Sequence, residues 1–319
     1  MTEQTTAYES VLFPGQGSQE RGMGRDLAES DRQIMDLWRL AEKKSGARLR
    51  EIFWDGDEQA MTQTRYQQPA LFVTGMGLWR HLSPLLSPAF MAGHSVGEFT
   101  ALAAAGALGV QEALDLVCLR GRFMFEAGEH RSGCMAAVLK LDKDTVQSIV
   151  SQACEQTEDV LCVANYNSPQ QTVISGARPA LERALEMVRD NKGRGKELPV
   201  SGAFHSRLMD EPARELARVI EKMSWHRPDI PVHLNVTAQP CSGPQEIART
   251  LSRQMISPVL WSQLILDQWD KGVRMWWELG PKGVLTRLMQ HILGEKEEPW
   301  EAEYVCTLEG IEQVRERMR

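Results

Sequence analysis

The sequence of 319 residues contains no long hydrophobic run and no excess of positive charge. Its most apolar stretch, residues 101–110, falls well short of the ~20 residues that a membrane-spanning helix needs. The first ten residues are polar and acidic, unlike a secretory signal. With 36 Lys and Arg against 43 Asp and Glu, the net charge of −7 offers no general attraction to nucleic acid or to an anionic membrane. We therefore expect a protein that binds neither a membrane nor nucleic acid.

The six cysteines form no Cys-x-x-Cys pair and have no zinc-like spacing with histidine. They are Cys118, Cys134, Cys154, Cys162, Cys241 and Cys306. In a chain of this length, such scattered cysteines are typical of buried side chains in a reducing compartment. We therefore expect a cytoplasmic protein, and nothing in the sequence calls for a metal or a bound organic cofactor.

Short apolar runs alternate with amphipathic helical patterns, which predicts an α/β fold with a mainly parallel sheet. Outside the middle of the chain, the predicted strands are residues 10–13, 89–92, 231–235, 273–278 and 304–306. The predicted helices there include residues 98–105, 111–128, 211–223, 244–255 and 281–293.

The middle of the chain follows a different order. Its predicted elements are a strand at 135–141, a helix at 142–156, strands at 160–164 and 171–175, a helix at 179–191 and a strand at 197–200. The order β-α-β-β-α-β is that of a ferredoxin-like module. We therefore predict a small domain at residues 132–201, inserted into a larger α/β domain made of residues 1–131 and 202–319. One continuous sheet is the alternative.

Residues 93–97, Gly-His-Ser-Val-Gly, form a G-x-S-x-G pattern between a predicted strand and a predicted helix. Glycines at both ends permit a sharp turn that exposes the Ser95 hydroxyl at the positive end of the helix. Negative charge developing on a carbonyl oxygen would be stabilised there. Ser95 is therefore the candidate nucleophile, and a glycine-rich turn with an unreactive serine is the alternative.

A serine hydroxyl is a weak nucleophile and needs a base, for which the sequence offers seven histidines. His94 is adjacent to Ser95, but neighbouring side chains on a sharp turn diverge, so we expect His94 to be structural. His205 lies in a loop between a predicted strand and a predicted helix, where α/β folds carry working groups. It is the candidate base, with a structural histidine as the alternative.

Arg120 lies in the middle of the apolar stripe of its predicted helix, whereas Arg122 lies on the opposite face and can pair with Glu126. A guanidinium aimed into the core needs an anion, because an unpaired buried charge costs several kcal/mol. That anion is either a carboxylate of the protein or a substrate carboxylate held by two parallel hydrogen bonds. The pattern favours neither.

Residues 13–19, Phe-Pro-Gly-Gln-Gly-Ser-Gln, follow the first predicted strand and match no phosphate-binding loop. The backbone N–H of Gln16, between two glycines, is placed to serve an oxyanion. A plain turn is equally compatible with the sequence.

Eight short motifs, spread over nearly the whole chain, are together similar to those of malonyl-CoA:acyl-carrier-protein transacylases. They are Phe-Pro-Gly-Gln-Gly-Ser-Gln (13–19), Gln-Gln-Pro-Ala (67–70), Gly-His-Ser-Val-Gly-Glu (93–98), Arg-Gly-Arg-Phe-Met (120–124), Asn-Ser-Pro (167–169), Ala-Phe-His-Ser (203–206), Arg-Gln (253–254) and Glu-Leu-Gly-Pro (278–281). The resemblance implies a hydrolase-like α/β domain with a ferredoxin-like insert, in agreement with the predicted elements.

The same resemblance implies a two-step transfer through a covalent acyl-enzyme. Ser95 would attack the thioester of malonyl-CoA, and His205 would take and return the proton. The main-chain carbonyl of Gln254 would orient the imidazole in place of a triad carboxylate. The malonyl group would then pass to the phosphopantetheine thiol of an acyl carrier protein, for fatty-acid synthesis.

The resemblance also implies that Arg120 binds the malonyl carboxylate and that the backbone N–H groups of Gln16 and Val96 form the oxyanion hole. Phe204 would crowd the α-carbon of the acyl group, which favours malonyl over methyl-branched units. We expect a monomer that needs no cofactor. The alternatives are a trans-acting polyketide acyltransferase, a serine acyl-CoA hydrolase that uses the same Ser95 and His205, and a non-catalytic module that sequesters acyl chains or carrier protein.

Acyl carrier proteins are acidic, and so is this chain, so its net charge cannot attract them. A local basic cluster near the end of the predicted insert could do so. The cluster consists of Arg189, Lys192, Arg194 and Lys196. A solvated turn with loose charges is the alternative.

Overall fold

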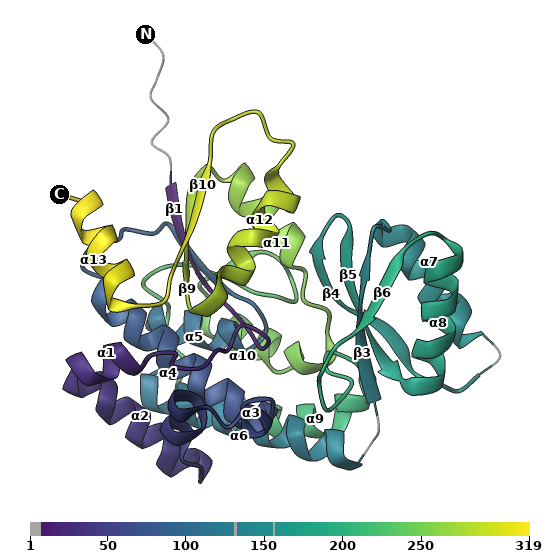
Figure 1. The fold of residues 1–319 in the computed structure, drawn as a ribbon, viewed down its shortest axis with the longest axis horizontal. Coiled ribbons are helices and arrows are strands. Elements are labelled where there is room, and N and C mark those ends of the chain that lie inside the picture. Colours follow the sequence, from purple (N-terminus) through teal and green to yellow (C-terminus); the bar gives the residue numbers. More distant parts are fainter. Residues whose placement is uncertain (1–7, 131–132, 156) are drawn as a thin grey trace.

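The computed structural model describes residues 8–130, 133–155 and 157–319 (Figure 1). Its main sheet consists, in spatial order, of β10 (Glu301–Val305), β9 (Val273–Leu279), β1 (Tyr8–Phe13), β2 (Phe90–Gly93), β7 (Val232–His233) and β8 (Pro240–Cys241). All neighbours pair in parallel except β8, which is antiparallel to β7. The predicted parallel sheet is therefore confirmed, with one short antiparallel strand at its edge.

A second sheet is antiparallel throughout and is separate from the first. Its strands, in spatial order, are β4 (Leu161–Ser168), β5 (Gln171–Ala177), β3 (Gly133–Leu139) and β6 (Arg194–Glu197). Helices α7 (Lys143–Cys154) and α8 (Arg178–Asp190) lie together on one face of it (Figure 1). The chain order β3-α7-β4-β5-α8-β6 is the predicted β-α-β-β-α-β order. Gln156 and the predicted boundary at residues 131 and 132 lie outside the described residues.

Helices flank both faces of the main sheet (Figure 1). They are α1 (Arg25–Ser30), α2 (Arg32–Ser45), α3 (Glu58–Met61), α4 (Thr64–Leu82), α5 (Val96–Ala104), α6 (Val110–His130), α9 (Asp210–Ile220), α10 (Pro244–Leu251), α11 (Trp261–Asp270), α12 (Val284–Leu293) and α13 (Leu308–Arg317). The adjacent residues Trp276 and Trp277 of β9 are both buried, and they belong to two different hydrophobic cores. Because successive strand residues point to opposite faces, this tryptophan pair serves the cores on both sides of the sheet.

Several predicted elements differ from the structure at their ends, and in three of them the physical reason is clear. The helix predicted at 281–293 begins only at Val284, because Lys282 (φ 67°) and Gly283 (φ 56°) have left-handed backbone. The helix predicted at 244–255 ends at Leu251, and a separate 3₁₀ turn, Gln254–Ile256, follows it. The strand predicted at 197–200 lies three residues earlier, as β6, because residues 194–197 pair with β3.

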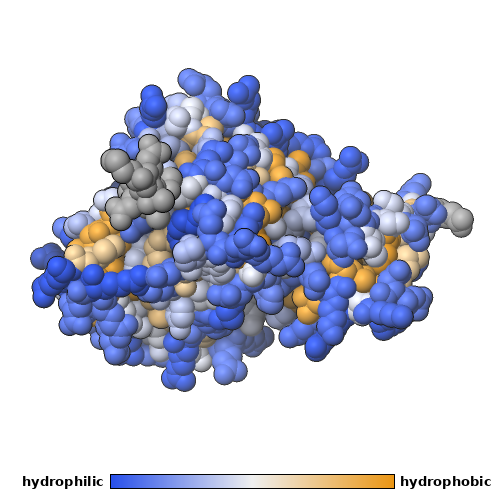
Figure 2. All heavy atoms as spheres, turned by 90° about the horizontal axis from the view of Figure 1, so that it is seen from above, coloured by the Kyte–Doolittle hydropathy of each residue, from blue (hydrophilic) through white to orange (hydrophobic). Residues whose placement is uncertain are grey.

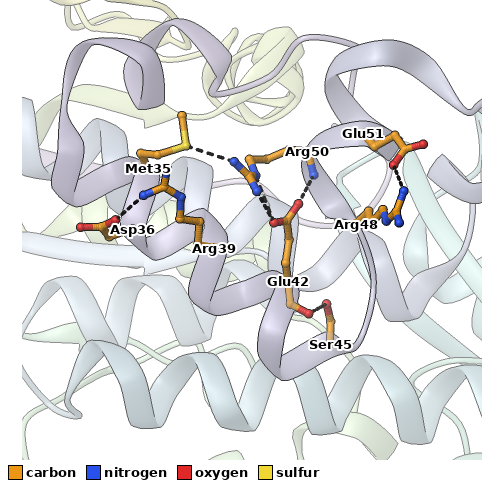
Figure 3. Close-up of polar contacts among 8 residues, drawn as sticks. All are labelled: Met35, Asp36, Arg39, Glu42, Ser45, Arg48, Arg50 and Glu51. Atoms are coloured by element: carbon orange, nitrogen blue, oxygen red, sulfur yellow. Dashed lines mark hydrogen bonds and ion pairs between the residues drawn. The ribbon is translucent and has the colours of Figure 1, made fainter.

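The segment that follows α2 is fixed by one arginine (Figure 3). The Arg50 backbone N–H and guanidinium both donate to the Glu42 carboxylate, at 2.7–3.0 Å. The remaining guanidinium nitrogen, Nη1, lies 3.4 Å from the sulfur of Met35. These contacts tie the short π-helix Glu51–Gly56 to α2, on the side of the molecule away from the small sheet.

Candidate active site

Ser95 lies at the sharp turn between β2 and α5, in a backbone conformation (φ 53°, ψ −108°) that is uncommon for a residue with a side chain. The flanking glycines are required by the packing. A Cβ at Gly93 would lie 2.0 Å from the carbonyl group of Gly97, and a Cβ at Gly97 would lie 2.1 Å from the backbone oxygen of Phe13. The G-x-S-x-G pattern therefore forms the predicted strand-turn-helix, with Ser95 directly before the first turn of α5.

Asn235, which follows β7, braces this turn. Its Oδ1 accepts a hydrogen bond of 2.7 Å from the backbone N–H of Ser95, and its Nδ2 donates one of 2.7 Å to the backbone oxygen of Gly93. Asn235 is completely buried. Because both partners belong to the turn, the Asn235 side chain holds the strained backbone around Ser95 in place.

His205 contacts the Ser95 hydroxyl across 110 residues of sequence. Its Nε2 lies 2.8 Å from Ser95 Oγ, and its Nδ1 lies 3.0 Å from each of the backbone oxygens of Gln254 and Ser257. A carbonyl oxygen only accepts hydrogen bonds, so Nδ1 must carry the proton in a neutral ring. The lone pair is then on Nε2, facing the hydroxyl, which is the arrangement that a general base needs.

Burial, together with the neighbouring Arg120 charge, lowers the pKa of His205 to about 3, although the two backbone acceptors raise it. The ring is therefore neutral at physiological pH and free to take a proton. His94, by contrast, directs its Nε2 at the side chain of Asn167, 2.9 Å away. This contact agrees with the structural role expected for His94.

Arg120 reaches Ser95 from the core. Its Nη2 donates to Ser95 Oγ and to the side-chain oxygen of Gln254, both at 3.0 Å. The guanidinium is 1 % exposed and forms no ion pair with any described carboxylate, and its Nε has no hydrogen-bond partner among the described residues. Two anions were considered for Arg120, a carboxylate of the protein and a carboxylate of the substrate. Among the described residues, no protein carboxylate pairs directly with it.

The negative charge that compensates Arg120 is the carboxylate of Glu98. The side chain of Gln254 lies between the two and is hydrogen-bonded to both. Gln254 Nε2 donates to Glu98 Oε2 at 2.7 Å and to the backbone oxygen of Ser95 at 2.8 Å. Burial raises the pKa of Glu98 to about 7, although Gln254, Asn235 and Arg120 each lower it. Burial also lowers the pKa of Arg120 to about 10, against the attraction of Glu98.

A cavity of about 200 Å³ opens onto the reactive pair. Its wall includes Gln16, Ser95 and His205, together with Phe204 and Met124, which lies one helical turn beyond Arg120. The Arg120 side chain itself lies behind Ser95 and not in this wall. The site is thus an accessible hydroxyl with a base on one side and a buried cation on the other.

The backbone N–H groups of Gln16 and Val96 donate no hydrogen bond to any of the described residues. That of Val96 belongs to the first turn of α5, whose dipole favours negative charge at this end. The Gln16 side chain points elsewhere, because its Nε2 donates to Thr64 Oγ1 at 3.0 Å.

The residue patterns selected Ser95, His205 and Arg120, and the family resemblance added Gln254. Hydrogen bonds connect the four in the structure. Sequence reasoning missed Glu98, Asn235 and the Ser257 carbonyl. A signal for Glu98 was present, because it is the one charged residue in a short helix that is otherwise uncharged and mostly apolar. Asn235 and Ser257 carry no such signal, since their contacts depend on tertiary structure.

The acyl transferase domain family matches residues 11–312 of this chain. The malonyl CoA-acyl carrier protein transacylase of Haemophilus influenzae is 36 % identical over 292 residues, which cover 90 % of this chain and 92 % of that protein. The enzyme of that name from Bacillus subtilis is also 36 % identical, over 89 % of this chain and 90 % of its own. The chain belongs to this acyltransferase family. It is therefore an enzyme that transfers acyl groups.

Solved structures agree with the family. The malonyl-CoA:acyl carrier protein transacylase from Xanthomonas oryzae pv. oryzae is 34 % identical, with a TM-score of 0.90 over 98 % of each chain. A malonyl-transacylase solved in complex with a type II PKS acyl-carrier protein is 31 % identical, with a TM-score of 0.90 over 98 % of this chain and 100 % of its own. Within the described residues, no helix has both the length and the apolar character to cross a bilayer.

Proposed function

We propose that this acyltransferase moves the malonyl group from malonyl-CoA to the phosphopantetheine thiol of an acyl carrier protein, through an ester on Ser95. The observation that carries the proposal is the pair of contacts at Ser95 Oγ: His205 Nε2 at 2.8 Å and Arg120 Nη2 at 3.0 Å. The names of the relatives support it, because they specify malonyl CoA as donor and an acyl carrier protein as acceptor.

In the first step, Ser95 Oγ attacks the thioester carbonyl while His205 Nε2 removes its proton. The carbonyl oxygen becomes an oxyanion, and the free N–H groups of Gln16 and Val96 stabilise it. The intermediate then breaks its C–S bond, and the CoA sulfur leaves with the proton from His205. The product is malonyl-Ser95, with His205 neutral again.

The second step is the reverse reaction with a different thiol. His205 takes the proton of the phosphopantetheine thiol, the thiolate attacks the malonyl ester, and Ser95 leaves with that proton. The carbonyl oxygens of Gln254 and Ser257 stabilise the imidazolium in both steps, because they accept hydrogen bonds from its Nδ1–H. No metal or organic cofactor takes part in this scheme.

The preference for a malonyl group follows from Arg120. An acyl group on Ser95 Oγ begins 3.0 Å from the guanidinium, and a carboxylate two carbons beyond the carbonyl replaces the hydroxyl as its partner. The Nε that now lacks a partner supplies a second donor. The place of Phe204 in the cavity wall supports the expectation that this side chain crowds the α-carbon of the acyl group.

The remaining expectations belong to the same proposal. We infer that the turn after β2 lies in a hydrolase-like α/β domain and that residues 132–201 form an inserted ferredoxin-like domain. We also propose a monomer. For its location we propose the cytoplasm, because the six free cysteines are typical of a reducing compartment. Fatty-acid synthesis is the proposed pathway. Polyketide synthesis is the second candidate, because a segment of the polyketide biosynthesis protein ThaF of Burkholderia thailandensis, 24 % of that protein, is 40 % identical over 290 residues.

The test is the intact mass of the protein after brief exposure to malonyl-CoA, followed by addition of holo acyl carrier protein. We expect one malonyl adduct, which Ser95→Ala abolishes, and its quantitative movement to the carrier. His205→Asn, which tolerates the left-handed backbone at this position (φ 56°), should slow acylation by ~10²–10⁴-fold without loss of fold. Release of free malonate with no loaded carrier would instead identify a hydrolase. Carriers from the two pathways, compared side by side, decide between the pathways.

A further inference from the structure

Residues 15–18, Gly-Gln-Gly-Ser, form a tight turn shortly after β1. The backbone N–H of Ser18 donates to the backbone oxygen of Gly15 at 3.3 Å, which closes the turn. The third residue, Gly17, has φ 102°, the left-handed region that a type II β-turn requires at this position. The closing bond is longer than the usual range of about 2.7–3.2 Å, so the backbone alone holds this turn weakly.

The Ser18 side chain adds a second and shorter bond to the same oxygen. Its Oγ donates to the backbone oxygen of Gly15 at 2.7 Å, and Ser18 is 1 % exposed. Gly15 is also packed against the turn that carries Ser95, because a Cβ on Gly15 would lie 2.5 Å from the backbone oxygen of His94. The Gly15 carbonyl is therefore held in one direction, toward Ser18.

The direction of this carbonyl determines the direction of the Gln16 N–H. The two groups belong to one planar trans peptide unit, in which N–H and C=O point opposite ways. With the carbonyl on Ser18, the N–H points away from it. This N–H donates to none of the described residues, and Gln16 lines the cavity at Ser95. The bonds that the carbonyl accepts also polarise the peptide, which makes its N–H a stronger donor.

The side chain of Gln16 is held by a separate contact. Its Nε2 donates at 3.0 Å to Oγ1 of Thr64, which is completely buried at the start of α4. This bond keeps the long side chain away from the N–H of the same residue. It does not fix the peptide that precedes Gln16, and that part is left to Ser18.

We propose that Ser18 is a positioning residue for acyl transfer, because its hydroxyl holds the Gly15–Gln16 peptide with the N–H directed at the oxyanion. The inference depends on the proposed function, which places the Gln16 N–H in the oxyanion hole. Ser18 itself does not touch the substrate in this scheme. It acts only through the peptide that it orients.

A buried serine hydroxyl needs a partner in any fold, so the contact alone would be compatible with a purely structural role. Ser10 of β1 has such a role: it is completely buried, and its Oγ donates to the backbone oxygen of Phe90 at 3.1 Å. The N–H of that peptide, on Met91, is already bound to the backbone oxygen of Pro231 at 3.0 Å. Ser18 differs because the N–H of its partner peptide is free at a cavity.

The first test is the acylation rate of Ser18→Ala, which removes the hydroxyl but keeps Gln16 and the backbone bond of the turn. We expect kcat and kcat/KM for acylation of Ser95 by malonyl-CoA to fall together by about tenfold, less than the ~10²–10³-fold cost of losing an oxyanion donor. The fall with acetyl-CoA should be equally large, because both thioesters form the same oxyanion. Ser18→Thr, which keeps a hydroxyl, should recover much of the rate.

The second test is a spectroscopic signature that a structural role would not change. Malonyl-CoA labelled with ¹³C at the thioester carbonyl places the label in the ester on Ser95, where infrared difference spectra report its carbonyl stretch. Hydrogen bonds to this oxygen lower the stretching frequency. We expect a higher frequency in Ser18→Ala than in the wild type, and a return toward the wild-type value in Ser18→Thr.

Ser10→Ala is the matched control, since it removes another buried hydroxyl from a backbone oxygen on the strand that leads to the same turn. It should leave the rates and the carbonyl stretch unchanged. Both serines are buried, so neither substitution changes the outer surface, which is mostly hydrophilic on the face in Figure 2. Chemical denaturation checks the fold of each variant. Ser18→Cys, a weaker donor, serves the same test if Ser18→Ala does not fold.

A wild-type acylation rate or an unshifted carbonyl stretch in Ser18→Ala would overturn the proposal. So would an equal loss of rate in Ser10→Ala, because reduced stability would then explain the effect. A loss with malonyl-CoA alone would show that the hydroxyl acts through Arg120 and not through the oxyanion. Absence of a malonyl-Ser95 adduct in the wild type would instead refute the proposed function, so the two failures are distinguishable.

Discussion

The side chain of Gln254 donates a hydrogen bond of 2.7 Å to the carboxylate of Glu98, in a part of the core where neither residue is more than 1 % exposed. The same amide group accepts from Arg120, and the backbone oxygen of Gln254 accepts from His205. One residue therefore contacts both the candidate base and the candidate carboxylate-binding group. The Gln254 amide is held in this orientation because its Nε2 faces two acceptors, Glu98 Oε2 and the Ser95 backbone oxygen, and its oxygen faces Arg120, which can only donate.

Glu98→Gln should disturb Arg120 while it leaves the volume of the site unchanged. Glu98 accepts from the backbone N–H of Asn235 at 3.2 Å as well as from Gln254, and a glutamine can accept only one of the two bonds. We expect the free energy of unfolding to fall by ~1–3 kcal/mol. We also expect the ratio of kcat/KM for malonyl-CoA to that for acetyl-CoA to decrease, because the Gln254 oxygen no longer holds the guanidinium.

The matched control is Glu215→Gln, which neutralises an exposed glutamate on α9 and should change neither quantity. The purely structural alternative for Glu98 predicts a lower stability with an unchanged malonyl-to-acetyl ratio. That result would remove the positioning role.

Arg120→Lys retains a positive charge but loses the planar pair of donors. We expect kcat/KM for malonyl-CoA to fall by ~10–100-fold, equivalent to the ~1.5–3 kcal/mol of a hydrogen bond to a charged group. Acetyl-CoA has no carboxylate, so its slow transfer should be retained or increased. Both substrates are compared in the same acylation assay. An equal loss with both would show that Arg120 serves the Ser95 hydroxyl and not the substrate carboxylate.

The sequence predicts the reactive groups better than the supports around them. Ser95 is marked by its glycines, and Arg120 by a charge within an apolar stripe, and both signals are local. The interaction of His205 with Ser95 spans 110 residues and was inferred from loop position and family resemblance. Asn235 lies 140 residues from Ser95, just after a strand of only two residues, and no pattern of residues marks it.

The alternation of predicted strands and helices was sufficient to predict the parallel sheet and the order of elements in the small sheet. Burial of one face gives strands and helices different periods of apolar residues, and these periods can be read from the sequence. The ends of elements depend on backbone dihedrals instead. The left-handed Lys282, which delays the start of α12, has no local signal, since lysine is rarely found in that region. Likewise, residues 194–197 are all exposed, so only their pairing with β3 identifies them as a strand.

Asn235→Ala should loosen the turn that carries Ser95. The substitution leaves the Ser95 N–H and the Gly93 carbonyl without partners in a buried position, which should lower the free energy of unfolding by ~1–3 kcal/mol. Asn235→Asp keeps the acceptor for Ser95 but replaces the donor to Gly93 with an oxygen that repels the carbonyl. We expect acylation of Ser95 to be slower in both variants, measured by the mass of the adduct against time. Full-rate acylation in a destabilised Asn235→Ala would show that the turn is held without this side chain.

As the pH decreases from about 8 to about 5, titration of His205 should cost the acylation rate almost nothing. Burial, assisted by Arg120, lowers the pKa of His205 from 6.5 to about 3, so its neutral form persists throughout this range. A base with the ordinary pKa of 6.5 would lose about 30-fold at pH 5, because only about 3 % of it would be unprotonated. Single-turnover malonylation measured at several pH values distinguishes the two. A tenfold fall per pH unit below 6.5 would contradict the structure.

The lowered pKa of His205 preserves the acylation rate at low pH, but it decreases the stability of the folded state there. The folded state binds the His205 proton less tightly than the unfolded chain, so this contribution to stability is complete above 6.5 and is lost as the pH falls toward about 3. His233, whose pKa burial lowers to about 4, acts in the same direction. Chemical denaturation at each pH therefore has to accompany the kinetics.

Arg120→Ala, assayed with acetyl-CoA, should raise the pH below which acylation slows. The substitution removes the second cause of the lowered His205 pKa, while burial remains.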